Sequence, residues 1–276
     1  MEEPRTSPPA ADDQALLERV RAGDSEALEA LLERYEAPLF RFSMRMCRDR
    51  EDAREILQES LLAAARSIGE FRGDAALSTW LFTIARSFCI KYRRKPRPTD
   101  SAVADEQVTA MEDPRPAPDE RVADRELLAA VERAIETLDP GYREVLLLRD
   151  VEGLTAPEVA SALEMSVSQV KSRLHRARVA LREELSPLLA ELHPPPDGPV
   201  PGCPDIAETF SRFLEDEISA DLCAEMQSHV DSCGHCQSTC DSLKHTLAVC
   251  NAVPAPEVPQ DIQQAVRAEI RKLSRG

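Results

Sequence analysis

Three residues near the C-terminus have the types and spacing of a metal site. His229, Cys233 and Cys236 are separated by four and three positions, so on one helix they would share a single face. Imidazole nitrogen and thiolate sulfur are the donors that zinc prefers, and a cysteine from the preceding segment, such as Cys203, would complete a tetrahedron. The sequence therefore predicts a four-ligand metal site, which in its simplest role would staple a small domain that has little core of its own.

The same segment holds more thiols than one such site needs, because Cys223, Cys240 and Cys250 lie within it as well. Soft thiolates suit zinc, cadmium or cuprous copper. One interpretation of the surplus is metal sensing, with these three cysteines as additional sensing ligands, and another is a purely structural zinc site. Thiol-based redox sensing is a third interpretation. A C-x-C pair is absent from the sequence, which favours zinc or cadmium and leaves copper open.

A second kind of chemistry is suggested by residues 154–185, which predict two helices joined by a very short turn. Thr155 with Glu158 and Ser166 with Gln169 each form a capping box, which marks a helix start. Apolar residues at helical spacing predict a buried inner face, formed by Val159, Leu163, Val167, Val170, Leu174 and Leu181. The second helix carries cations that we expect on its outer face, namely Lys171, Arg173, Arg176, Arg178 and Arg182. A helix-turn-helix with a basic second helix can enter a DNA major groove.

Composition narrows the class of protein. The 276 residues carry a net charge of −16, which argues against nonspecific coating of nucleic acid, yet residues 86–97 form a second basic island without an acid. No apolar run is long enough to span a membrane, and no secretory signal is present, so we expect a cytoplasmic protein with reduced thiols. Cys47 and Cys89 lie on apolar helix faces and are expected to be buried. No phosphate loop, catalytic triad or H-E-x-x-H motif indicates an enzyme.

The chain is expected to be all-α, with two helical domains and a small metal-binding domain. The predicted boundaries are 1–11 disordered, 12–96 first helical domain, 97–124 linker, 125–192 second helical domain, 193–202 linker, 203–253 cysteine-rich domain and 254–276 tail helix. The linkers are rich in proline, so we expect the domains beside them to move independently.

Several motifs together resemble RNA polymerase sigma factors of the extracytoplasmic-function (ECF) group. Residues 52–59 (DAREILQE) and 71–86 (FRGDAALSTWLFTIAR) are similar to the σ2 domain of that family. Residues 138–145 (LDPGYREV) and 170–177 (VKSRLHRA) are similar to its σ4 domain. The order and spacing of the motifs agree with the family over the larger part of the chain.

The resemblance implies partners and residue roles. The partners would be promoter DNA and core RNA polymerase, through its β′ clamp helices and β flap, with no membrane involved. The implied polymerase-binding residues are Asp52, Glu55, Gln58 and Glu59. The loop 71–78, Trp80 and the basic run would open the −10 element, and the helix 167–181 would read the −35 element. The implied DNA-binding residues are Arg86, Lys91, Arg93, Arg94, Ser168, Gln169, Lys171, Ser172, Arg173, His175 and Arg176.

Residues 203–276, which we call the tail, contain a segment that resembles the zinc-binding motif of anti-sigma factors, in which a helix presents one His and two Cys. This implies a ligand set of Cys203, His229, Cys233 and Cys236. The extra thiols are similar to those of CorE-like sigma factors, whose fused cysteine-rich domain senses metal. We therefore expect a metal-responsive ECF sigma factor that requires no separate anti-sigma factor and whose tail blocks σ2 or σ4 in one state. The alternatives are a DNA-binding regulator with a structural zinc module and a redox-sensing sigma factor.

Overall fold

The computed structural model describes residues 10–47, 49–94, 119–192, 203–252 and 257–273. These residues form helices and no strand, which confirms the predicted all-α class. The predicted linker 193–202 and residues 97–118 of the first linker lie outside the described residues. Residues 119–124, which were assigned to that linker, are instead the start of a helix.

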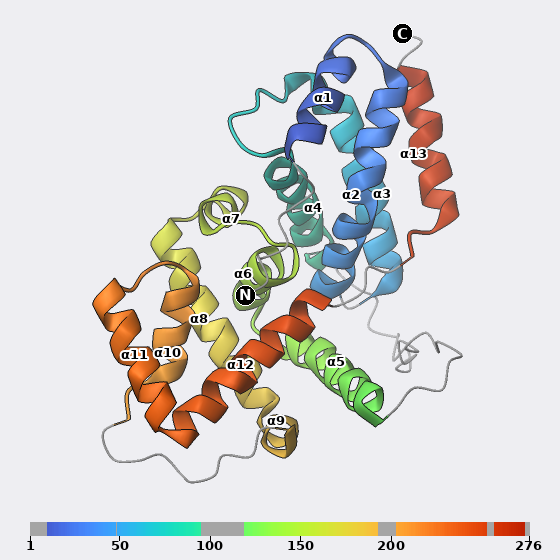
Figure 1. The fold of residues 1–276 in the computed structure, drawn as a ribbon. Coiled ribbons are helices and arrows are strands. Elements are labelled where there is room, and N and C mark those ends of the chain that lie inside the picture. The colour runs from blue at the N-terminus through green and yellow to red at the C-terminus, as the bar shows by residue number, and fades with distance from the viewer. Residues whose placement is uncertain (1–9, 48, 95–118, 193–202, 253–256, 274–276) are drawn as a thin grey trace.

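The first bundle is the upper half of Figure 1. Its helices are α1 (Ala10–Arg21), α2 (Ser25–Met46), α3 (Arg50–Ser67) and α4 (Leu77–Arg93), with a short 3-10 turn at Ile68–Glu70. Asp24 and Asp49 cap α2 and α3 by accepting bonds from the backbone N–H groups that follow them. Leucines and aromatic residues of α2, α3 and α4 are fully buried between the helices and form the core that fixes their packing.

The second bundle carries the predicted helix-turn-helix. Its helices are α5 (Asp119–Thr137), α6 (Pro140–Leu146), α7 (Ala156–Leu163), α8 (Val167–Glu184) and α9 (Ser186–Leu192), with a π-helical turn at Leu147–Val151 after α6. The backbone over 140–151 thus changes from α-helical to π-helical hydrogen bonding at Leu147.

The tail folds into a small bundle of α10 (Ile206–Leu214), α11 (Ala220–Ser232) and α12 (Gly234–Ala252), followed by the separate helix α13 (Gln260–Leu273). α12 runs from the small bundle to the junction between the two larger ones, and α13 lies beside α2 and α3 (Figure 1). The tail therefore packs on both predicted sigma domains.

The two larger bundles are packed against each other, although we expected them to move independently. Arg41 of α2 pairs with Glu152 at 2.6 Å, and the Glu152 carboxylate is almost completely buried. Arg45 of the same helix pairs with Glu132 of α5 at 2.9 Å. In this arrangement, charged pairs and apolar contacts join helices that lie on opposite sides of the first linker.

Candidate metal centre and nucleic-acid interface

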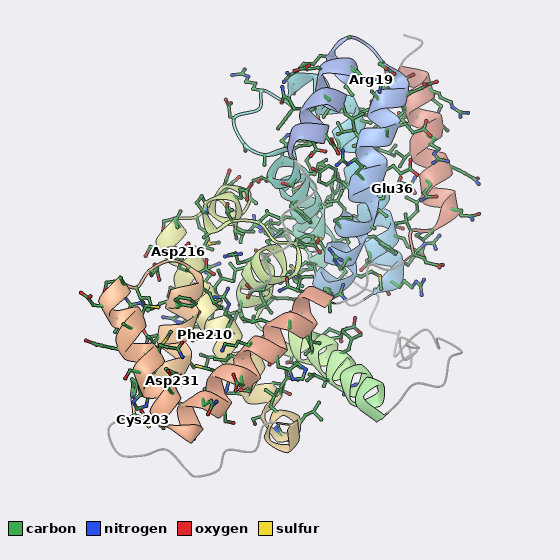
Figure 2. The ribbon with its side chains drawn as sticks, in the orientation of Figure 1. Arg19, Glu36, Cys203, Phe210, Asp216 and Asp231 are labelled. Carbon is green, nitrogen blue, oxygen red and sulfur yellow. The ribbon has the colours of Figure 1, made fainter. Side chains whose placement is uncertain are left out.

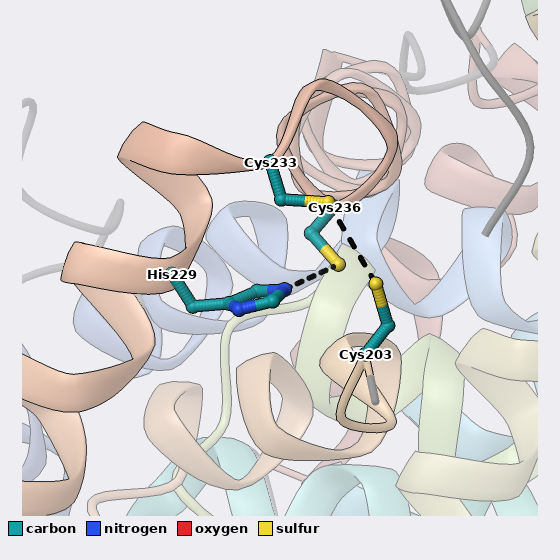
Figure 3. Close-up of side chains that lie close together, drawn as sticks. All are labelled: Cys203, His229, Cys233 and Cys236. Atoms are coloured by element: carbon teal, nitrogen blue, oxygen red, sulfur yellow. Dashed lines mark hydrogen bonds between the residues drawn. The ribbon is translucent and has the colours of Figure 1, made fainter. Parts of the chain in front are cut away.

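The four predicted metal ligands converge in the small bundle (Figure 3). The donor atoms of Cys203, His229, Cys233 and Cys236 all lie within 4.8 Å of one another. The Sγ atoms of Cys203 and Cys233 are 3.7 Å apart, and the His229 Nε2 is 3.2 Å from the Cys236 Sγ. A tetrahedral zinc with Zn–S bonds of about 2.3 Å has S···S edges of about 3.8 Å, so this donor set fits such an ion.

The expectation that one helix presents His229, Cys233 and Cys236 is wrong. α11 ends at Ser232, Cys233 is extended at φ −124° and ψ 105°, and α12 begins at Gly234. The break turns the chain, so the His229 ring, the Cys233 thiol and the Cys236 thiol meet from two helices. Cys203 approaches from the segment before α10, so one ion there would tie together all three helices of the small bundle.

The two cysteines beside the break have opposite acidities. The backbone N–H of Cys236 donates towards Cys233 and lowers the pKa of that thiol. Burial is the main reason that the pKa of Cys236 is raised to about 12. A bound cation would favour both thiolates, since metal ligation requires the deprotonated form.

The predicted additional sensing ligands are not gathered with these four. Cys240 is buried in the core of the small bundle, and Cys250 is completely buried in the larger core near the junction of the bundles. Burial raises the pKa of Cys250 to about 12 and also raises the pKa of Cys240. Cys223 lies half-buried on α11. A sensing role for these thiols stays a prediction.

The helix-turn-helix has the expected local geometry. Both capping boxes are formed, with Thr155 and Ser166 accepting from the N–H groups of Glu158 and Gln169. Glu164, in the turn, adopts the left-handed conformation at φ 54° that helix ends commonly use. Both helices thus begin where the sequence predicts, and the first one ends at Glu164.

Two residues of α8 lie on the opposite face from the expected one. Val167, assigned to the inner face, is 37% exposed. Arg178, assigned to the outer face, is only 3% exposed and pairs with Asp150 at 2.6 Å. A guanidinium that is both buried and matched by a carboxylate at this distance supports the bundle rather than presenting a free charge to solvent.

The small bundle lies along α8 (Figure 1). Lys171 donates to the Glu215 carbonyl at 2.8 Å, and Arg182 contacts the hydroxyls of Ser242 and Thr239 on α12. An open cleft of about 250 Å³ separates α8 from α10. On the α8 side, four of the predicted DNA-binding residues line it, namely Ser168, Lys171, Ser172 and His175.

The other predicted DNA-binding residues are distributed over both larger bundles. Gln169 and Arg176 are exposed on α8, whereas a guanidinium nitrogen of Arg173 lies against Gly141 of α6. In the first bundle, Lys91, Arg93 and Arg94 are exposed at the end of α4. Arg86 instead pairs with Glu144 of α6 at 3.1 Å, so the contact between the bundles uses this cation.

The four predicted polymerase-binding residues lie along α3. Burial and a hydrogen bond that Tyr92 of α4 donates to Glu55 raise the pKa of Tyr92 to about 12, and the charges of Asp52 and Glu59 add to this effect. Gln58 is one turn from Arg54, on the row of α3 that also contains Arg66. Arg54 and Arg66 pair with Asp261 and Glu269 of α13, both at 2.7 Å, so α13 lies over this row.

Arg149 and Glu215 are functional candidates that the sequence did not reveal. The Arg149 Nε donates to the Glu215 carboxylate at 3.2 Å across the interface between the second bundle and the tail. Each residue is one charge among many in the sequence, and only the packing of α10 brings them together.

Three protein families match separate regions of the chain. Residues 31–99 match the family described as "Sigma-70 region 2", residues 128–181 match "Sigma-70, region 4", and residues 203–237 match "Putative zinc-finger". The "RNA polymerase sigma-H factor" of Pseudomonas aeruginosa is 35% identical over 186 residues, which are 65% of this chain and 96% of that protein. This chain belongs to the family of ECF RNA polymerase sigma factors.

A second relative agrees with this assignment. An "ECF RNA polymerase sigma-E factor" from Salmonella typhimurium is 32% identical over 64% of this chain and 96% of its own length. A solved structure of the sigma factor RpoE with the anti-sigma factor NepR, from Bartonella quintana, is 25% identical, covers 55% of this chain and 92% of that one, and has a TM-score of 0.44. The expectation that no separate anti-sigma factor is required has no support among these comparisons.

The family assignment settles the general role of this sigma factor. It is a transcription initiation factor that directs RNA polymerase to specific promoters, and no family of enzymes is indicated. Among the described helices, none is long and apolar enough to cross a membrane.

Proposed function

We propose that this sigma factor is held inactive by its own C-terminal region, and that metal at the Cys₃His site controls its release. The observation that carries the proposal is the position of the tail. α10 covers one side of α8, the helix proposed to read the −35 element, and α13 covers one row of α3, the helix proposed to bind polymerase. Both surfaces are occupied by the same chain.

The roles proposed for α8 follow from exposure and charge. Ser168, Gln169, Ser172 and Arg176 are exposed and can approach base edges, while Lys171 is held by the tail. In the first bundle, Lys91, Arg93 and Arg94 offer an electropositive end of α4 to the −10 strand. Arg86 would join them once its contact with Glu144 opens.

The packing of the two bundles argues for a conformational change before initiation. Reading the −35 and −10 elements together requires the two bundles to contact separate stretches of DNA. Here Arg41, Arg45 and Arg86 of the first bundle are paired with glutamates of the second. We therefore assign the arrangement in Figure 1 to the inactive state.

Metal would be held by Cys203, His229, Cys233 and Cys236, and when bound it would fix the relative positions of α10, α11 and α12. α12 leads directly from this site to the junction of the two bundles and to the segment that carries α13. A change in the small bundle can therefore alter both the contact of α10 with α8 and the contact of α13 with α3. We keep zinc, cadmium and cuprous copper as candidates, in the manner of CorE-like sigma factors, and propose that the switch acts in the cytoplasm without a separate anti-sigma factor.

A structural zinc site is the second candidate for the tail, because a single four-ligand cluster is enough to staple a small bundle. Transcription by the full-length protein with core RNA polymerase on a pool of random-sequence promoter templates tests the choice. The protein is compared after chelation and after reloading with zinc, cadmium or cuprous copper. Promoter-specific transcripts in one metal state only support the proposal, and equal transcription in every state supports a structural zinc site.

Failure to transcribe in any metal state would contradict the proposed activity as a whole. The same assay on Cys240→Ser and Cys250→Ser tests the additional thiols, with Cys47→Ser as a control for loss of a buried thiol in the first bundle. If both tail variants keep the metal response of the wild type, these thiols are not sensing ligands.

A further inference from the structure

The end of α10 places an acidic turn, Glu215-Asp216-Glu217, against the basic side of α8. Asp216 has a left-handed φ of 55°, which ends the helix and lets the glutamates on both sides of it reach α8. Figure 2 marks Asp216 at this turn between α10 and α11. Glu215 itself is nearly completely buried, with its side chain 3% exposed.

Three cations of the second bundle contact this turn. The Glu215 carboxylate accepts from Arg178 at 2.8 Å and from Arg149 at 3.2 Å, so it bridges two guanidinium groups. Lys171 lies 3.3 Å from the Glu217 carboxylate. Bridging of this kind is typical of an anion recognised by several donors, as a phosphate group is.

The backbone at the end of α10 adds to the negative charge of the turn. Carbonyl groups of the last turn accept from the same three cations: Ser211 from Arg178, Leu214 from Arg149 and Glu215 from Lys171. Because free carbonyls make the C-terminus of a helix the negative pole of its dipole, α10 presents both this pole and two carboxylates to the cations.

The three cations differ in what remains when the tail leaves. Arg178 keeps its pair with Asp150, which belongs to the same bundle. Lys171 and Arg149 have their ion pairs with the tail and would lose them together. Both cations would then be freed on the side of the second bundle that α10 covers, and Lys171 would lie beside the exposed residues Ser168 and Ser172 of α8.

We infer that Lys171 and Arg149 contact the phosphate backbone of DNA in the active state, and that the acidic turn is a stand-in for those phosphates. Tail and DNA then compete for the same two cations. The inference rests on the proposed function, since it names how the tail blocks the DNA surface. It also assigns a binding role to Arg149, which precedes the helix-turn-helix.

The test measures binding of the full-length protein to a labelled random-sequence 20-base-pair duplex, because phosphate contacts do not depend on sequence. Glu215→Lys places a cation between Arg149 and Arg178 and should expel the turn. Glu208→Lys is the matched control, because Glu208 lines the same cleft on α10 but forms no ion pair among the described residues. The two variants have the same net charge.

We expect Glu215→Lys to bind the duplex at least tenfold more tightly than Glu208→Lys. Two additional phosphate contacts should also steepen the slope of log affinity against log salt by about 1.8. Adding Arg149→Ala to Glu215→Lys should reduce that slope by about 0.9, whereas adding Arg133→Ala, at an exposed position on α5, should leave it unchanged.

Hydrogen exchange of α8 and α10 in each variant shows whether the turn has left. Equal affinity of the two lysine variants when α10 is released would overturn the inference. So would a slope of log affinity against log salt that stays the same when Arg149→Ala is added to Glu215→Lys. If α10 stays in place in Glu215→Lys, the acidic turn is not what holds it, and the inference is equally wrong. Neither polymerase nor metal enters this assay, so its failure is separable from failure of the proposed function.

Discussion

The packing of α13 on the first bundle allows the free-energy cost of one substitution to be calculated. Val266 is 2% exposed and lies between Ile262 and Ile270 in the buried row of α13. Val266→Ala removes two buried carbons, which at about 0.8 kcal/mol per buried CH₂ costs about 1.6 kcal/mol. Because 1.4 kcal/mol is a factor of ten, release of α13 should become about 15 times more frequent.

Polar contacts beside this row set the orientation of α13 and contribute less to its affinity. Arg267 pairs with Glu29 at 2.6 Å, and Gln263 donates to Glu36 at 2.9 Å. Figure 2 shows Glu36 on α2, facing α13. The Arg267 pair is partly exposed to solvent, where such a pair contributes at most about 1 kcal/mol. The apolar row is therefore the part to change.

Two measurements check the prediction on the full-length protein. Amide hydrogen exchange should show protection in α13 falling about 15-fold in Val266→Ala, while α2 and α3 keep theirs. Affinity for core RNA polymerase should rise by a similar factor. The apparent affinity is proportional to the fraction of molecules in which α13 is released, as long as that fraction is small. Gln264→Ala, at an exposed position of the same helix, is the control and should change neither quantity.

The reasoning would be refuted if α13 exchanged faster in Val266→Ala while polymerase affinity stayed at the wild-type value. In that case α13 would cover a surface that polymerase does not use. Unchanged exchange in α13 would instead show that the buried row does not hold the helix.

Three further predictions concern Arg41, Cys250 and His229. Arg41→Ala should reduce the free energy of unfolding by about 3–5 kcal/mol, because it leaves the buried Glu152 carboxylate unpaired, and chemical denaturation measures this loss. Burial raises the pKa of Cys250 to about 12, so the native state holds this proton more tightly than the unfolded state does. Its contribution to stability should be complete below about pH 8.5 and fall by about 1.4 kcal/mol per pH unit above that, up to pH 12, and denaturation of Cys250→Ala should lack this slope. His229→Ala should lower metal stoichiometry and increase hydrogen exchange in α10–α12 but not in α2–α4, and equal exchange in both regions would count against a local staple.

Much of the local structure could be predicted from the sequence. The capping boxes at Thr155 and Ser166 marked both helix starts, because a cap depends on residues only three positions apart. The convergence of Cys203, His229, Cys233 and Cys236 was also predicted, although the expected single-helix geometry was wrong. Helical spacing alone does not reveal a break such as the one at Cys233.

Assignments of residues to helix faces failed where partners distant in the sequence decide burial. The sequence analysis places Arg178 on the outer face with the other cations of its helix, but Asp150 and Glu215 together satisfy its charge inside the protein. Cys250 was grouped with the other tail thiols, yet the length of α12 carries it to a different core. Neither outcome follows from the periodicity of one helix, since each depends on which helix packs against it.

The sequence by itself determined the family, the helical class, the start of each helix of the helix-turn-helix and the four residues that converge at the candidate metal centre. Each of these depends on residue types at short, fixed spacings. Only the tertiary structure decided that α10 would lie on α8, that α13 would lie on α3, and that Glu215 would meet Arg149. These contacts depend on apolar faces and opposite charges that many pairs of helices could offer, and the packing of the whole chain selects among them.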